Sequence, residues 1–323
     1  MTKLELNIDL YKKLYLIRKA EKEIQEYYFE DEMKTPMHMS MGEEAIVTGV
    51  CQALRDRDQV LGTYRSHALY LAKTGETDKF FAEMYGKSTG VAKGKAGSMH
   101  LSAPEMGFMG ASAIVASIIP VAIGVAFANK IMKNNKITAV FFGDGAIDEG
   151  DFWESLNAAC LWNIPILFIC EDNGLAVHTS GNKRHGYKSI TDIVSKFNCN
   201  VIEEQSTDAE IIYKQTRKAI ELMKKNKRPC FLHFRYYRYL EHVGVNEDFN
   251  AGYRSRKEFE KWYKKDPILL QRKKLLKLGA KETMVEKIEN RINNKIKKSI
   301  ELAKAAPFSK INEIYQDIFY EKK

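Results

Sequence analysis

Two short apolar runs separated by one helix-length segment constrain this chain more than any other feature. Residues 137–142 (ITAVFF) and 165–170 (PILFIC) are rich in β-branched and aromatic side chains, and they end in the polar sequences GDG and EDNG. The segment from about 150 to 162 between them has helical spacing. Strand, helix and strand in this order are typical of a parallel crossover unit. The chain is therefore predicted to have an α/β fold.

The rest of the chain extends this pattern. Residues 10–28 and 208–225 have the spacing of amphipathic helices, residues 31–110 are rich in loops, and residues 229–240 are a third strand candidate. Lys-rich helical sequence then runs to the end. We expect a mostly parallel sheet with helices on both faces in one domain, residues 1–265, followed by a helical C-terminal extension, residues 266–323.

An uncharged stretch between Glu105 and Lys130 imitates a membrane span. Glycines, serines and Pro120 break it into a loop and a short helix, so the roughly 20 continuous apolar residues of a span are not available. We expect a core helix in which Gly124 and Ala128 permit close packing on a neighbouring element. No association with a membrane is predicted.

The charge of the chain is concentrated near its end. The formal net charge is +9, and residues 261–323 hold 17 basic and 8 acidic residues, so the remainder is close to neutral. A solvated helical face explains this better than a nucleic-acid surface. The five cysteines are an odd number without CxxC spacing, which argues against disulfides and a zinc site. With an N-terminus that lacks a signal peptide, these features predict a cytoplasmic protein.

Two polar side chains follow the two strongest strands at the points where the strands end. Asp144 and Asn173 lie 29 residues apart, about one crossover unit. Ligands of an open parallel sheet bind beyond the carboxyl ends of its strands. Carboxylate and amide oxygens suit Mg²⁺, which takes its other ligands from phosphate and water. The spacing favours a magnesium-diphosphate site, and an ordinary Gly-Asp-Gly turn is the alternative.

Several motifs then resemble one enzyme family. GDG, 26 further residues and Asp172-Asn173 look like the fingerprint of thiamine-diphosphate enzymes. TYRSH (63–67), GKAGSMH (94–100), GDGAIDEGDFWESLNAACLWNIP (143–165) and ICEDN (169–173) resemble the alpha subunit of pyruvate, branched-chain and acetoin dehydrogenases, as does RYL-H with a following YRS between 238 and 255. The resemblance covers about residues 30–270. It implies a thiamine-diphosphate-binding fold that uses thiamine diphosphate and Mg²⁺.

The resemblance assigns roles to individual residues for cofactor binding. Tyr64 and Arg65 would hold the diphosphate, and Gly145 and Ala146 would contact it through their backbone. An Arg fork matches phosphate oxygens, although a structural ion pair is the alternative for Arg65. The magnesium ligands would be Asp144, Asn173 and the carbonyl of Leu175.

Further positions match parts of the site nearer the reaction. Ala113 and Val115 match backbone contacts to the aminopyrimidine ring, with plain core packing as the alternative. His38 matches an active-site histidine near the reacting carbon, and His242 matches one beside the diphosphate and substrate. Imidazole exchanges protons near neutral pH, but each ring viewed without the family would be read as structural.

The chain also departs from the family pattern. Asp172-Asn173 stands where relatives often have Asn-Asn, and the metal-binding second position is kept. Leu240-Glu241-His242-Val243 stands where animal pyruvate dehydrogenases have His-Gly-His-Ser. Val243 replaces the phosphorylatable serine, which excludes kinase control there. The loop from His242 to Tyr253 is also about two residues longer than in those relatives.

The implied activity is decarboxylation of a small, pyruvate-like 2-oxo acid, with transfer of the acyl group to a lipoyl group or another acceptor. About 150 residues follow the fingerprint, and they contain no second α/β unit to supply the glutamate that activates the cofactor. The family places that half on a separate beta subunit. We expect an assembly of two alpha and two beta subunits, with a lipoyl acyltransferase as a further partner.

Two other functions are compatible with parts of the sequence. Asp172-Asn173-Gly174 also resembles transketolases, so half of a split transketolase or a sugar carboligase is the alternative enzyme. A basic scaffold or nucleic-acid binder would rest on the C-terminal lysines alone. Such a protein would bind nucleic acid in a salt-sensitive way that does not depend on Asp144.

Overall fold

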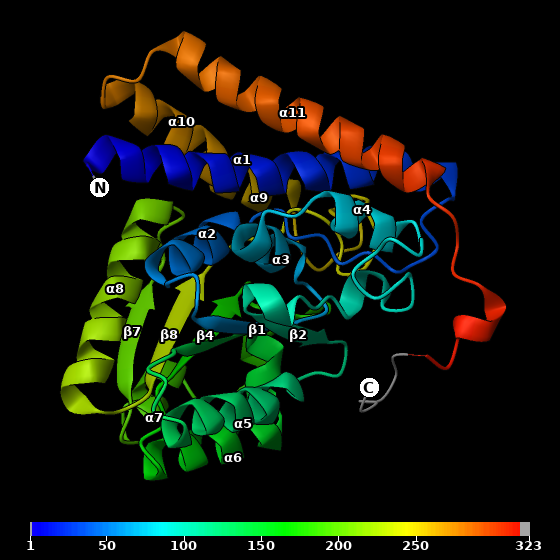
Figure 1. Cartoon of the computed structure of the whole chain (residues 1–323). Coiled ribbons are helices and arrows are strands. Elements are labelled where there is room, and N and C mark those ends of the chain that lie inside the picture. The colour runs from blue at the N-terminus through cyan, green and yellow to red at the C-terminus, as the bar shows by residue number, and fades with distance from the viewer. Residues whose placement is uncertain (1, 317–323) are drawn as a thin grey trace.

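A six-stranded parallel sheet forms the centre of the computed structural model, which describes residues 2–316 (Figure 1). The strand order is β2-β1-β3-β4-β8-β7. The strands are β1 (Gln59–Thr63), β2 (Phe108–Ser112), β3 (Thr138–Gly143), β4 (Ile166–Asp172), β7 (Asn200–Glu204) and β8 (Cys230–Arg235), and β5 (Leu175–Ala176) and β6 (Thr179–Ser180) form a separate antiparallel pair. Every residue of β4 is buried, as expected for a strand covered on both faces. The predicted α/β class is confirmed.

Helices cover both faces of the sheet, and Figure 1 shows them as separate layers. On one face lie α5 (Ile118–Ile131), α6 (Gly150–Leu161) and α7 (Ile190–Val194), which share one apolar core with the sheet. The other core contains α2 (Glu44–Ala53), α3 (His67–Thr74), α4 (Asp78–Met84) and α8 (Ala209–Asn226). The short 3₁₀ helices are η1 (Tyr28–Glu30), η2 (Gly97–Met99), η3 (Pro104–Met106), η4 (Asp144–Asp148), η5 (Gly181–Lys183) and η6 (Ile311–Glu313).

An outer layer joins the two ends of the chain. It consists of α1 (Lys3–Tyr27), α9 (Arg256–Tyr263), α10 (Pro267–Lys277) and α11 (Glu282–Ala305). A third apolar cluster connects α1 with α10 and α11, which lie beside it in Figure 1. Buried Arg18 of α1 pairs with Glu44 at 2.6 Å and with Asp266 at 2.8 Å. The C-terminal segment is helical as predicted, and the domain boundary at 265/266 stays a prediction.

Several boundaries differ from the expected ones for local reasons. The first helix begins at Lys3 because Thr2 and Glu5 form a reciprocal capping box. The strand predicted over residues 229–240 is β8, and it ends at Arg235, earlier than predicted. Further along, the Tyr239 N–H donates to the Met41 carbonyl, outside the sheet. In α5, Gly124 is exposed and a Cβ built on it would meet nothing within 4 Å, so the close packing expected at this glycine is not found. No helix in the described part of the chain is long and apolar enough to cross a bilayer.

Candidate functional site

A cavity of about 220 Å³ opens where β1, β3, β4 and β8 end. Parallel strands carry their carboxyl ends to one edge of a sheet, so segments far apart in the sequence meet here. Asp144 follows β3 and Asn173 follows β4, and both line this cavity. So do Tyr64, Arg65 and His242. The convergence that the spacing predicted for Asp144 and Asn173 is present.

Asp144 is the first residue of η4 and is almost fully buried. Its Oδ2 accepts from the Arg184 guanidinium, whereas Oδ1 has no hydrogen-bond partner among residues 2–316. Burial, followed by the charge of Asp172, raises the Asp144 pKa to about 6, and Arg184 opposes this increase. Arg184 therefore leaves Asp144 Oδ1 as a buried acceptor without a partner among residues 2–316, which a cationic ligand can use.

Asn173 and Asp172 point to different partners. Asn173 Nδ2 donates to Tyr236 at 3.0 Å, and its Oδ1 accepts from the Leu175 N–H at 3.1 Å. Asp172 instead pairs with His233 at 2.7 Å and with Arg235 at 2.8 Å. The second of the two adjacent polar residues is therefore the one available to the cavity. Leu175 also lines it.

The backbone beside Asp144 packs closely against Ala176 of β5. Gly145 and Ala146 line the cavity, and a Cβ added to Gly145 would come within 3.0 Å of the Ala176 Cβ. That distance is tighter than ordinary side-chain contacts, so glycine is the residue that fits without displacing β5. The described residues hold no group of three or more His, Cys, Asp or Glu that forms a complete metal site. A cation here would need further oxygens from its ligand or from water.

Arg65 is held at the cavity by two backbone carbonyls. Its Nη1 donates to Met39 at 2.7 Å and its Nη2 to His242 at 2.9 Å. The guanidinium is buried and has no carboxylate within ion-pair distance among the described residues, so the structural ion pair weighed above is not formed. Arg65 thus keeps a positive charge next to the cavity. Anions are the ligands that such a group attracts.

His38, Tyr64 and His242 form an aromatic cluster. The ring centroids of His38 and Tyr64 lie 4.5 Å apart, and those of His38 and His242 lie 5.4 Å apart. Burial, then the charge of Arg65, lowers the pKa of each imidazole to about 3. Both rings are therefore neutral near pH 7. His38 does not line the cavity itself and reaches it through Tyr64.

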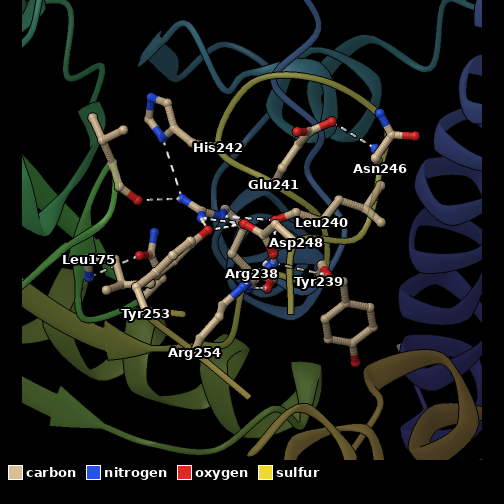
Figure 2. Close-up of polar contacts among 12 residues, drawn as sticks. Leu175, Arg238, Tyr239, Leu240, Glu241, His242, Asn246, Asp248, Tyr253 and Arg254 are labelled. Atoms are coloured by element: carbon tan, nitrogen blue, oxygen red, sulfur yellow. Dashed lines mark hydrogen bonds and ion pairs between the residues drawn. The ribbon is translucent and has the colours of Figure 1, made fainter. Parts of the chain in front are cut away.

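The His242 loop is fixed by two buried arginines, as Figure 2 shows. Arg238 Nη1 lies 3.3 Å from His242 Nδ1 and also donates to the Val177 carbonyl at 3.3 Å. Because a guanidinium only donates, Nδ1 is the acceptor and the proton of the neutral ring lies on Nε2. Arg254 pairs with Asp248 and donates to the Leu240 carbonyl at 2.8 Å. These bonds connect the chain before His242 with the loop that follows it.

One predicted position and two further histidines lie outside the cavity lining. Val115 lines the cavity, but Ala113 does not. His67 is buried, and its Nδ1 shares a hydrogen bond of 2.7 Å with Glu21 Oε1. His100 is exposed.

The sequence did not single out four residues at the cavity: Glu43, Glu171, Arg184 and Tyr236. Glu43 and Glu171 are buried, and burial raises the pKa of both carboxyls, that of Glu43 to about 8. Their position beside apolar runs was the available signal, since a buried charge without a partner is costly. Arg184 lies in a loop 40 residues from Asp144, and no motif near it in the sequence indicates a role in the site.

The chain resembles known proteins over most of its length. Residues 12–312 match the family model described as "Dehydrogenase E1 component". The chain is 32% identical over 316 residues to the alpha subunit of acetoin:2,6-dichlorophenolindophenol oxidoreductase of Bacillus subtilis, covering 97% of this chain and 94% of that protein. It is 33% identical over 321 residues to the pyruvate dehydrogenase E1 component subunit alpha of Porphyra purpurea (96% and 92%). The corresponding subunit of Rickettsia bellii is 30% identical over 313 residues (97% and 95%).

These matches span nearly the whole of each protein, and they bear out the resemblance that the motifs carried. The chain belongs to the dehydrogenase E1 component family.

Proposed function

We propose that this chain is the alpha subunit of a thiamine-diphosphate-dependent 2-oxo-acid dehydrogenase, which decarboxylates a small, pyruvate-like 2-oxo acid and passes the acyl group to a lipoyl group or another acceptor. The observation that carries the proposal is the meeting of Asp144, Asn173 and Arg65 in one cavity at the carboxyl edge of the sheet. Oxygen ligands and a buried guanidinium in one cavity suit a magnesium-bound diphosphate.

The residues present fit such a group. The unpartnered Asp144 Oδ1 and the Asn173 side chain offer oxygen ligands to Mg²⁺, with the Leu175 carbonyl as the third. Gly145 and Ala146 would offer backbone N–H groups to phosphate oxygens, and Arg65 and Tyr64 line the same cavity. When bound, thiamine diphosphate supplies the carbon nucleophile and the electron sink for loss of carbon dioxide.

The chain's own residues orient the bound groups and hold protons at defined atoms. His242 presents an Nε2–H, because Arg238 occupies Nδ1, so the ring donates a hydrogen bond while remaining neutral. His38 is likewise neutral, and its Nδ1 has no hydrogen-bond partner among residues 2–316, with Tyr64 between the ring and the cavity. These two rings are the proposed catalytic histidines. Val115 and Ala113 are proposed to border the cofactor ring.

The partner follows from the same proposal. The likeness to alpha subunits supports a separate beta subunit, and we infer an assembly of two alpha and two beta chains. Full decarboxylase turnover by the purified chain alone would rule this out.

The test measures magnesium-dependent binding of thiamine diphosphate by calorimetry, with and without the beta-type partner. We expect Asp144→Asn and Asn173→Ala each to weaken binding by about tenfold or more, since each removes a metal ligand. The exposed Asp192→Asn is the matched control and should bind as the parent does. If the parent assembly binds no thiamine diphosphate with Mg²⁺, or if all three variants bind alike, the proposed site is wrong.

The substrate is tested on the reconstituted pair. Pyruvate with lipoamide or an artificial electron acceptor should give turnover, whereas a ketose donor with an aldehyde should not. The reverse result would assign the chain to the transketolase or carboligase alternative.

A further inference from the structure

A second cleft lies at the opposite edge of the sheet, where the strands begin. It measures about 1040 Å³, several times the volume of the cofactor cavity. Its walls are the loops that lead into β1, β3, β4 and β8, together with the C-terminal ends of α5, α6 and α8. None of the residues proposed for the cofactor lines it.

The cleft is strongly basic. Arg55 and Arg57 precede β1, Lys133 and Lys136 precede β3, and Lys227 and Arg228 precede β8. Lys130 and Lys224 add two more cations from the ends of α5 and α8. Among the described lining residues none is Asp or Glu. Outside residues 261–323 the chain is close to neutral, so this is a local concentration of charge.

Most of these cations are not neutralised within the protein. Arg55 binds Asp58 at 2.7 Å, and Lys130 donates to the Trp162 carbonyl. The side chains of the other six make no ion pair with any residue between 2 and 316. Their Coulomb repulsion in a shared cleft must be offset by solvent ions or by a ligand.

Helix ends provide an opposing charge, but a smaller one. Cations near a helix C-terminus stabilise its dipole, and α5, α6 and α8 all end at this cleft. Each terminus carries roughly −0.5 of an elementary charge, about −1.5 in total. Six unpaired cations exceed that sum, so dipole stabilisation explains only part of the cluster. A positive surplus remains for an external anion.

The uncharged lining residues indicate the kind of anion. Five are asparagines, and Asn135 and Asn163 bring side-chain amides to the turns before β3 and β4. The Asn226 amide instead donates to Asn200 Oδ1 at 2.7 Å. No lining residue is aromatic, whereas sites for single-stranded nucleic acid stack bases on aromatic rings. Lysine, arginine and amide donors around a bounded cleft suit a compact ligand with several phosphate groups.

We propose that this cleft binds an oligophosphate, either an inorganic polyphosphate or the phosphate chain of a nucleoside triphosphate. The site is independent of the cofactor cavity, because the two lie at opposite ends of the strands. The volume accommodates a chain of several phosphates, and the cations on three separate loops can contact successive groups along it.

The test uses the full chain and tripolyphosphate as the probe. ATP is the second probe, and inorganic phosphate gives the affinity of the cleft for a single phosphate group. The variant Lys136→Glu/Lys224→Glu reverses two cations on different walls of the cleft. Its matched control is Lys297→Glu/Lys298→Glu, which reverses two exposed lysines on α11. Calorimetry gives the affinities, and thermal unfolding shows that each variant is folded.

We expect the parent to bind tripolyphosphate at least about tenfold more tightly than inorganic phosphate, and the cleft variant to lose about tenfold in affinity while the control changes less than about twofold. ATP binding as tightly as tripolyphosphate assigns the nucleotide form, and weaker ATP binding assigns the inorganic form. Equal losses in both variants, no binding by the parent, or tighter binding of a poly-glutamate peptide would overturn the proposal. Magnesium-dependent thiamine diphosphate binding should be unchanged in Lys136→Glu/Lys224→Glu, so failure here is distinct from failure of the proposed function.

Discussion

Several buried residues at the cavity are charged or polar, and the sequence predicted only some of them. Asp144 and Asn173 were predictable because a short strand must end in polar residues at the ligand-binding edge of a parallel sheet. Arg65 was predictable from its motif. The Arg184 contact to Asp144 was not, because a loop position depends on tertiary packing that spacing does not encode. Burial of the glutamates at positions 43 and 171 likewise depends on loops meeting in space.

The neutral imidazoles predict how stability changes in acid. Unfolded His38 and His242 take up protons near pH 6.5, whereas the folded rings do so only near pH 3, so the unfolded state binds protons first as the pH falls. The free energy of unfolding should therefore decrease as pH falls from about 6.5 towards 3. His38→Gln/His242→Gln should show a shallower decrease than the parent in urea unfolding series. The exposed His100→Gln is the control and should keep the parental slope; a parental slope in the double variant would contradict the assignment.

Glu43 predicts an effect of opposite sign. Burial raises its pKa to about 8 from an ordinary 4.5, so its contribution to stability is complete below pH 4.5 and is lost as the pH rises through 8. Glu43→Gln, which is always neutral, should match the parent near pH 5 and exceed it by about 1–3 kcal/mol near pH 9. Urea unfolding at the two pH values measures this. A difference that does not depend on pH would show that the carboxyl is ionised throughout.

At the level of elements, the sequence predicted best where periodicity was long or apolar. The strands β3 and β4 and the helices α6 and α8 lie close to their predicted positions. The region 31–110 was expected only as loops between short helices, and it also holds β1 and β2, whose pairing partners lie far along the chain. Its GKAG segment is ordered by Glu83, whose carboxylate accepts from the N–H groups of Ala92, Gly94, Ala96 and Gly97. A hydropathy pattern does not show four hydrogen bonds to one buried side chain, so the sequence could not predict this order.

Replacing two helical glycines with alanine should change the free energy of unfolding in opposite directions. In α2, a Cβ on Gly49 would lie 2.7 Å from the Ile212 Cβ and 2.8 Å from the Ala209 carbonyl oxygen of α8. Gly49→Ala should destabilise the chain by about 1–3 kcal/mol, because overpacking exceeds the gain in helix propensity. Gly124→Ala meets open space and should stabilise the lone chain by about 0.5–1 kcal/mol. Urea unfolding of both variants checks the pair, and the same sign for both would refute the packing argument.

For the whole molecule, the two edges and two faces of the sheet differ in what they leave exposed. The carboxyl edge holds the cavity proposed for the cofactor, and the amino edge holds the basic cleft. On one face, α1 and the C-terminal helices form a further layer outside the helices that contact the sheet. On the other face, α5 leaves an apolar stripe, with Val121 and Ile131 exposed by 53% and 65% and Phe127 by 41%. Large exposed apolar stripes mark surfaces that associate with other proteins.

This stripe is where we expect the proposed beta subunit to bind, because the segment that carries it starts at Val115 on the cavity wall and continues along α5. The exposed Gly124 between Val121 and Phe127 would let a partner helix approach closely. Phe127→Gln/Ile131→Gln should leave the unfolding free energy of the lone chain within about 0.5 kcal/mol. It should weaken association with the beta subunit by about 2–3 kcal/mol, or roughly 30- to 150-fold, since two anchoring side chains are lost.

The matched control is Phe29→Gln/Ile311→Gln, which removes the same two residue types from exposed positions away from α5. Sedimentation equilibrium of the mixed subunits measures the association of each variant, and the control should assemble as the parent does. Loss of thiamine diphosphate binding should follow loss of association in the α5 variant, because a partner docked beside Val115 would close the cavity against water. Unchanged association in the α5 variant, or an equal loss in the control, would place the partner on another face.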